Sequence, residues 1–163
     1  MVRTLIAGFG NELRGDDGFG VEVVQRVHRR LGDRTDVDVL EVGTGGLQLA
    51  QQLLDPYDRL VVVDAMTRGG RPGTMYVLEL ESVDEIHDVD LHLATPDRAL
   101  SVAQALGGLP AEVYLVGCEP GEIDELTMEF TAPVAAALDE AVEAVLRLMP
   151  PERVHSPEEV SDG

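Results

Sequence analysis

The chain has 163 residues, 44% of them hydrophobic, and its 31 acidic against 12 basic residues give a formal net charge of −19. That charge repels nucleic-acid backbones and anionic lipid surfaces, so we expect neither as a partner. All the basic residues are arginine, which excludes Schiff-base lysines and the lysine of a P-loop. There is no membrane-spanning apolar run and no visible export signal, and the single cysteine, Cys118, suits a reducing compartment. We therefore expect a cytoplasmic protein.

Apolar and helical patterns alternate along the chain. Apolar, β-branched runs predict five strands, at 4–9, 37–42, 59–65, 74–81 and 112–117. Helical periodicity predicts helices over 20–31, 47–55, 95–108 and 132–149. In the second of these helices the spacing places Leu47, Ala50 and Leu54 on one apolar side, and the third has Thr95 as its cap.

This alternation indicates a parallel sheet covered on both faces, an α/β fold of the three-layer α/β/α type. The connector 66–73 is too short for the crossover that a parallel neighbour needs. The fourth strand should therefore run antiparallel to the third, giving a five-stranded mixed sheet. Residues 1–149 should form a single domain, and the polar segment 150–163 a flexible tail.

The stretch GFGNELRGDDGFG, residues 8–20, follows the first strand. A dinucleotide-binding fingerprint would need a glycine where Leu13 stands. Asp16 and Asp17 would also repel a pyrophosphate at the start of the next helix, so the stretch does not favour nucleotide binding. Capping of the helix 20–31 explains one of the two carboxylates and leaves the other unexplained.

A second acidic position ends the third strand at Asp64. If the strand order is 2-1-3, Asp17 and Asp64 face each other at the carboxyl edge of the sheet, where a proton or a cation must relieve their repulsion. A loop cap is the alternative for Asp64. His92 precedes Thr95 in a loop that can reach this edge, although a lone loop histidine is more often incidental. Together Asp, Asp and His suit zinc, nickel or manganese.

A serine or cysteine nucleophile is not favoured. The chain contains no Gly-x-Ser-x-Gly elbow. Cys118 ends the fifth strand at the same edge, but no histidine stands at a recognisable spacing from it, so a small buried residue is the better interpretation.

Motifs spread over nearly the whole chain resemble those of the nickel–iron hydrogenase maturation proteases, endopeptidases that remove a C-terminal extension from the hydrogenase large subunit. These motifs are LIAGFGNELRGDDGFGV, GTGG, VVVDAM, PGTMYVLE and VGCEP. The resemblance implies metal-binding positions at Asp17, Asp64 and His92, and a five-stranded mixed sheet with one antiparallel strand. We expect Asp16 to serve the loop or the helix start instead. The resemblance also implies that nickel, already inserted in the precursor, is the recognition signal.

The loop EVGTGG matches a family loop associated with substrate selectivity, from which Glu41 and Val42 depart. We expect the turn Gly43, Thr44, Gly45 and Gly46 to bind substrate, because glycines let a peptide backbone approach closely.

Two functions remain open. One is a metal-dependent endopeptidase, in which Asp17, Asp64 and His92 are catalytic and hold a divalent ion. That ion is either nickel, which the substrate itself can carry, or zinc. The alternative is a non-catalytic nickel-sensing checkpoint that binds the hydrogenase large-subunit precursor.

Overall fold

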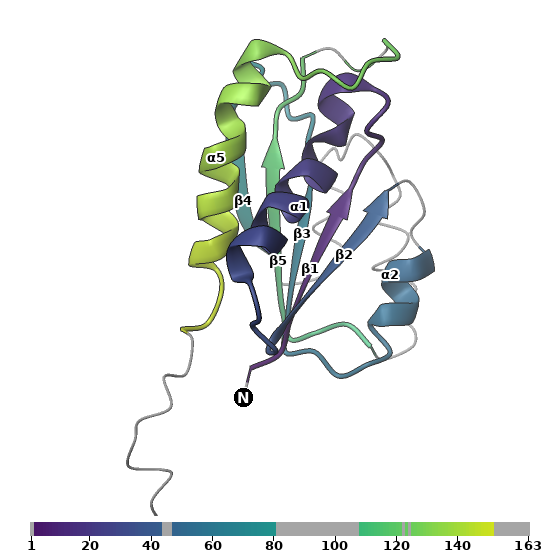
Figure 1. Cartoon of the computed structure of the whole chain (residues 1–163), viewed down its shortest axis with the longest axis vertical. Helices are drawn as coiled ribbons and strands as arrows, with labels where there is room; N and C mark the ends of the chain where they lie inside the picture. The colour runs from purple at the N-terminus through teal and green to yellow at the C-terminus, as the bar shows by residue number, and fades with distance from the viewer. Residues whose placement is uncertain (1, 44–46, 81–107, 122, 124, 152–163) are drawn as a thin grey trace, which may run out of the picture.

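Figure 1 shows the computed structural model of the chain, which describes residues 2–43, 47–80, 108–121, 123 and 125–151. The strands are β1 (Thr4–Phe9), β2 (Val37–Gly43), β3 (Arg59–Ala65), β4 (Met75–Leu80) and β5 (Glu112–Cys118). The helices are the 3₁₀ turn η1 (Gly15–Gly18), α1 (Phe19–Leu31), α2 (Leu47–Gln52) and α5 (Ala132–Arg147). All five predicted strands are present, whereas the helix predicted over 95–108 and most of the predicted tail lie outside the described residues.

The five strands form one mixed sheet in the order β2-β1-β3-β5-β4, so the predicted order 2-1-3 is confirmed. The other strands run parallel, and β4 pairs antiparallel with β5, which confirms the predicted direction of the fourth strand. The chain adds β2 on one side of β1 and then β3 on the other side. Ligands of such sheets bind beside this reversal, at the carboxyl ends of the strands.

β3 and β4 are nevertheless not neighbours, because β5 lies between them. Their short connector crosses the carboxyl end of β5. Met66 N–H donates to the Cys118 carbonyl at 2.9 Å, and Gly73 N–H donates to the Glu119 carbonyl at 2.8 Å. The connector therefore spans one strand and places β4 at the edge of the sheet.

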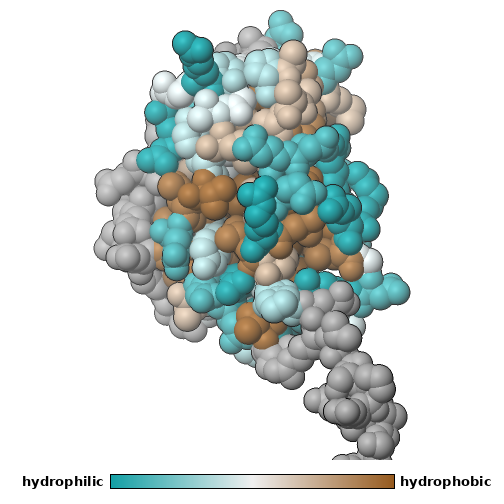
Figure 2. Space-filling model, turned by 90° about the vertical axis from the view of Figure 1, so that its left-hand side faces the viewer, coloured by the Kyte–Doolittle hydropathy of each residue, from teal (hydrophilic) through white to brown (hydrophobic). Residues whose placement is uncertain are grey.

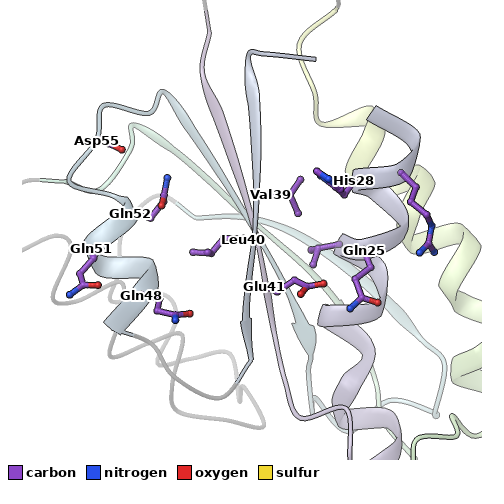
Figure 3. Close-up of a pocket in the computed structure, with 11 residues that line it drawn as sticks. Gln25, His28, Val39, Leu40, Glu41, Gln48, Gln51, Gln52 and Asp55 are labelled. Atoms are coloured by element: carbon purple, nitrogen blue, oxygen red, sulfur yellow. The ribbon is translucent and has the colours of Figure 1, made fainter. Parts of the chain in front are cut away.

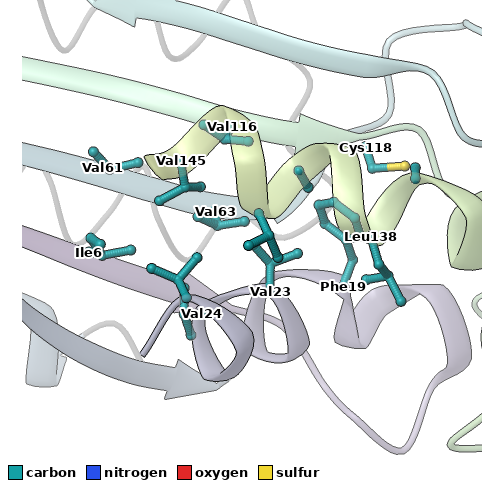
Figure 4. Packing of buried hydrophobic residues seen from close by; sticks show 14 of the residues in the cluster. Ile6, Phe19, Val23, Val24, Val61, Val63, Val116, Cys118, Leu138 and Val145 are labelled. Carbon is teal, nitrogen blue, oxygen red and sulfur yellow. The ribbon is translucent and has the colours of Figure 1, made fainter. Parts of the chain in front are cut away.

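Side chains alternate between the two faces of the sheet, and each face has its own core. On one face Leu5, Ala7 and Phe9 of β1 pack with residues of the α2 region. On the other face Ile6 packs with valines of α1 and α5, which lie side by side over the sheet (Figures 1 and 4). The three-layer α/β/α fold is confirmed.

The apolar side predicted for α2 is wrong in two of its three positions. Ala50 is buried, but Leu47 and Leu54 are 68% and 60% exposed, and Leu49 and Leu53 are buried instead. Both sets have helical spacing, so periodicity alone cannot choose between them. Contact with the sheet makes the choice, because Leu49 and Leu53 belong to the same apolar cluster as Phe9.

The side of the molecule that carries α5 shows hydrophilic residues beside a band of hydrophobic ones (Figure 2). Ion pairs cross here from α1 to α5, Arg26 with Asp139 at 3.2 Å and Arg30 with Glu143 at 2.9 Å. Such exposed pairs contribute at most about 1 kcal/mol each. None of the helices in the described part of the chain is long and apolar enough to span a membrane.

Candidate active site

The loop after β1 folds back on the turn that carries the two aspartates. Gly10 has φ of +132°, and a Cβ at this position would collide with the carbonyl oxygen of Asp17. Only glycine fits here. Asn11 N–H donates to Asp17 Oδ2 at 3.2 Å. Asp16 and Asp17 are buried, at 0% and 1% exposure, directly before α1.

The helix α1 itself sits tightly against the ends of two strands. A Cβ on Gly20 would collide with the carbonyl oxygens of Phe9 and Val63. This close approach brings the start of α1, and with it Asp17, to the carboxyl ends of β1 and β3.

Asp16 is a structural anchor. Its Oδ2 accepts hydrogen bonds from Gly121 N–H at 2.7 Å and from the Thr131 hydroxyl at 2.8 Å, and its Oδ1 accepts one from Thr131 N–H at 2.8 Å. Thr131 is the N-cap of α5, whereas the start of α1 has no side-chain cap. Asp16 therefore does not cap the following helix; it fixes the start of α5 instead.

Asp64 is the last residue but one of β3 and is buried, at 1% exposure. Ala65 N–H donates to its Oδ1 at 2.8 Å, and its Oδ2 has no hydrogen-bond partner within the described ranges. Burial raises the pKa of the Asp64 carboxyl well above its usual value, the negative charge of Asp17 raises it further, and the Ala65 N–H opposes the shift. A buried carboxyl oxygen without a partner is costly, and it signals a site for a proton or a cation.

The remaining predicted site residues are only partly within the described structure. Gly43 ends β2 with φ of +65°, a conformation that favours glycine, and its carbonyl accepts the Gly10 N–H at 2.9 Å. His92 and residues 44–46 lie outside the described residues. Among the residues that the structure does describe, no three His, Cys, Asp or Glu side chains converge on a common point.

A hollow of about 410 Å³ opens beside this loop. Its walls include Gly10, Asn11 and Leu13 of the β1–α1 loop, together with Glu41 and Gly43 of β2. The two buried aspartates therefore lie behind a loop whose outer surface is open to a ligand.

Comparison with known proteins settles which family has this arrangement. The family profile described as "Hydrogenase maturation protease" matches residues 21–148. The chain belongs to the hydrogenase maturation protease family. This match begins after Asp17 and includes the positions of Asp64 and His92.

Individual relatives extend the match over about nine tenths of the chain. The "Hydrogenase expression/formation protein HupD" of Rhizobium leguminosarum bv. viciae is 35% identical over 150 residues, which are 90% of this chain and 74% of that protein. The solved hydrogenase maturating endopeptidase HybD from E. coli has a TM-score of 0.80 at 30% identity, covering 90% of this chain and 91% of that one. The [NiFe] hydrogenase maturation protease HybD from Thermococcus kodakarensis has a TM-score of 0.77 at 28% identity, covering 91% and 100%. The resemblance inferred from the motifs is confirmed.

Cys118 is not poised as a nucleophile. Cys118 is 1% exposed, and burial, followed by the charge of Asp16, raises the pKa of its thiol to about 12. A thiolate is the reactive form of cysteine, so Cys118 stays an inert thiol near neutral pH. This agrees with its interpretation as a small buried residue.

Sequence reasoning missed Glu119, a buried residue at 4% exposure. Both of its carboxylate oxygens accept the Arg68 N–H, at 2.8 and 3.2 Å, which fastens the β3–β4 connector to the end of β5. Burial and the Glu119 charge raise the pKa of the Tyr76 hydroxyl. The available signal was an acidic residue at the carboxyl end of a buried strand, as for Asp64.

Proposed function

We propose that this protein is the endopeptidase that removes the C-terminal extension of a nickel-loaded nickel–iron hydrogenase large-subunit precursor, with Asp17, Asp64 and His92 in its active site. The observation that supports this most is the buried pair Asp17 and Asp64 at the carboxyl edge of the sheet, in a chain that belongs to a protease family. A folded protein keeps two mutually repelling buried carboxyls only where a proton or a cation offsets their repulsion.

The donor set fits a divalent ion. Asp64 Oδ2 is buried without a hydrogen bond from any described residue, and the Asp17 carboxylate adds a second negative charge beside it. Asp17, Asp64 and His92 would hold the ion, whether nickel carried by the substrate or zinc. A bound ion of this kind polarises a carbonyl and makes water more acidic.

The protein's own groups supply proton transfer and positioning. Because the pKa of Asp64 is raised, the pair without an ion retains a proton at a pH where an isolated aspartate has lost it. With the ion bound, a carboxylate oxygen that does not hold the ion could accept a proton from attacking water and deliver it to the leaving amine. The open loop Gly10–Asn11 and the turn that begins at Gly43 let a substrate backbone approach this pair.

The test is mass measurement of the large subunit after incubation with this protein. Precursor with and without nickel is treated with the parent and with Asp17→Asn, Asp64→Asn and His92→Ala. We expect loss of the extension only from the nickel-loaded precursor, and a rate reduced at least about a hundredfold in each variant, as for loss of a general acid or base. Asp33→Asn is the matched control, since Asp33 is exposed in the α1–β2 connection, which precedes β2 and so lies away from the carboxyl edge.

Two results would decide against the proposal. Full activity of Asp17→Asn and Asp64→Asn would remove these carboxyls from the mechanism. Tight binding of the loaded precursor by the parent without any loss of mass would favour the nickel-sensing checkpoint instead. Calorimetric titration with nickel or zinc, comparing Asp64→Asn and His92→Ala with the parent, tests the metal site separately.

A further inference from the structure

The outer edge of β2 presents backbone groups that lack a strand partner. β2 is an edge strand with β1 on one side. Thr4 N–H donates to the Asp36 carbonyl at 3.0 Å, and this bond fixes which β2 residues turn their backbone groups towards β1 and which turn them outwards. Val37, Val39 and Glu41 accordingly direct their N–H and C=O groups away from the sheet. No backbone group among the described residues pairs with these three, so the edge can accept another strand.

A polar groove follows this edge. A hollow of about 870 Å³ lies along β2 between α1 and α2 (Figure 3). Val39 faces the α1 side and Leu40 the α2 side, and both are only half buried. A strand added here would cover these side chains and complete the cores on both faces of the sheet.

Glutamine amides line the walls of the groove, contributed by Gln25 of α1 and by Gln48, Gln51 and Gln52 of α2. Gln25 and Gln52 are engaged within the protein, with Glu12 and with the Tyr57 hydroxyl. The Gln48 and Gln51 amides make no hydrogen bond with any described residue. A side-chain amide both donates and accepts, so these two can serve the backbone of a peptide of varied sequence.

The groove is continuous with the candidate active site. Glu41 lines both this groove and the smaller hollow beside Gly10, Asn11 and Gly43. The carboxyl end of β2 is tied to the β1–α1 loop by the Gly10–Gly43 hydrogen bond of 2.9 Å. A chain lying along β2 therefore reaches the loop that holds Asp17 without leaving the surface.

We propose that an extended segment of the large-subunit precursor binds as an additional strand on the outer edge of β2, between α1 and α2, and is led along it to the Asp17–Asp64 pair. This inference rests on the proposed function. Main-chain hydrogen bonds to Val37, Val39 and Glu41 supply the attachment, as in other cases of strand addition to an open sheet edge. A second copy of the chain is disfavoured as the occupant, because two molecules of net charge −19 repel each other.

The first test removes one outward donor. In Val39→Pro the edge loses the Val39 N–H, which does not face β1, so the sheet itself keeps its ladder. We expect the KM for nickel-loaded precursor, followed by mass measurement, to rise about fivefold to tenfold, while kcat stays within about twofold. Circular dichroism and thermal unfolding check that the variant is folded.

A second variant keeps the test decisive if proline perturbs the strand. Gln51→Trp narrows the groove from the exposed surface of α2 and should raise KM in the same way. Glu140→Trp is its control, because Glu140 is exposed on α5, which packs mainly over β5 and β4. Its KM should equal that of the parent.

The outcomes separate the two proposals. If the parent does not cleave the precursor, the proposed function and this inference both fall. Cleavage by the parent with unchanged KM in Val39→Pro and Gln51→Trp overturns the strand addition alone. Concentration-dependent dimers of the parent that Val39→Pro abolishes would assign the edge to a second copy and also overturn it.

Discussion

Replacing Asp16 by asparagine tests the anchoring role of this aspartate separately from the proposed role of Asp17. The change keeps the size of the side chain and removes one of its two acceptor oxygens. Asp16 is fully buried and accepts three hydrogen bonds from Gly121 and Thr131. Removing one acceptor oxygen should therefore lower the free energy of unfolding.

The magnitude follows from the two orientations of the new amide. If the amide oxygen takes the Oδ2 position, it keeps the Gly121 N–H and the Thr131 hydroxyl, and the NH₂ group faces the Thr131 N–H. If the oxygen takes the Oδ1 position, the NH₂ group faces the Gly121 N–H instead. Either way one buried N–H loses its acceptor, which costs about 1–3 kcal/mol, and the remaining bonds lose the charge that strengthened them. We expect a total loss of about 2–4 kcal/mol in the free energy of unfolding.

Urea unfolding followed by circular dichroism measures this loss. With an m-value of about 2 kcal/mol/M, the midpoint should fall by about 1–2 M. Thr131→Ser, which keeps the hydroxyl and the N–H, should stay close to the parent. A midpoint for Asp16→Asn equal to that of the parent would refute the anchoring role.

Three further predictions concern stability and reactivity. Because the raised pKa makes the folded state bind the Asp64 proton more tightly than the unfolded state, metal-free parent should lose stability as pH rises from about 4, the unfolded pKa, towards the folded value. Asp64→Asn should lack this decline, and at neutral pH it should be more stable than the parent by about 1–3 kcal/mol. Thermal unfolding of both proteins at about pH 4 and at neutral pH checks this. The Cys118 thiol should react with a disulfide reagent only after unfolding, and rapid labelling of the native protein would contradict its burial. In Gly20→Ala the added methyl meets the rigid backbone carbonyl oxygens of Phe9 and Val63. This overpacking should cost about 1–3 kcal/mol in the free energy of unfolding and lower the melting temperature by several degrees.

Local patterns in the sequence predict most of the sheet. The strand β3 contains three consecutive valines followed by Asp64, and such an apolar run is typical of a strand buried on both faces. The general rule for winding of α/β sheets then places Asp64 at the same edge as the loop after β1. The direction of β4 follows from the length of the connector alone.

Contacts between distant parts of the chain could not be predicted in this way. Nothing in the connector 66–73 shows that it crosses β5, because that depends on hydrogen bonds to Cys118 and Glu119. The six-residue α2 is too short for periodicity to fix its buried side. The sequence assigned Asp16 to the loop or a helix start, but it could not show that the partners of Asp16 are Gly121 and Thr131, more than a hundred residues away.

The separation of Asp16 from its partners also bears on synthesis of the protein. Gly121 and Thr131 follow Asp16 by 105 and 115 residues. A chain growing from its N-terminus makes the loop of Asp16 and Asp17 early and meets the groups that hold it much later. A ribosome-bound chain therefore cannot anchor Asp16 until the β5–α5 connection has left the exit tunnel. The loop that carries both aspartates reaches its final arrangement only late in synthesis.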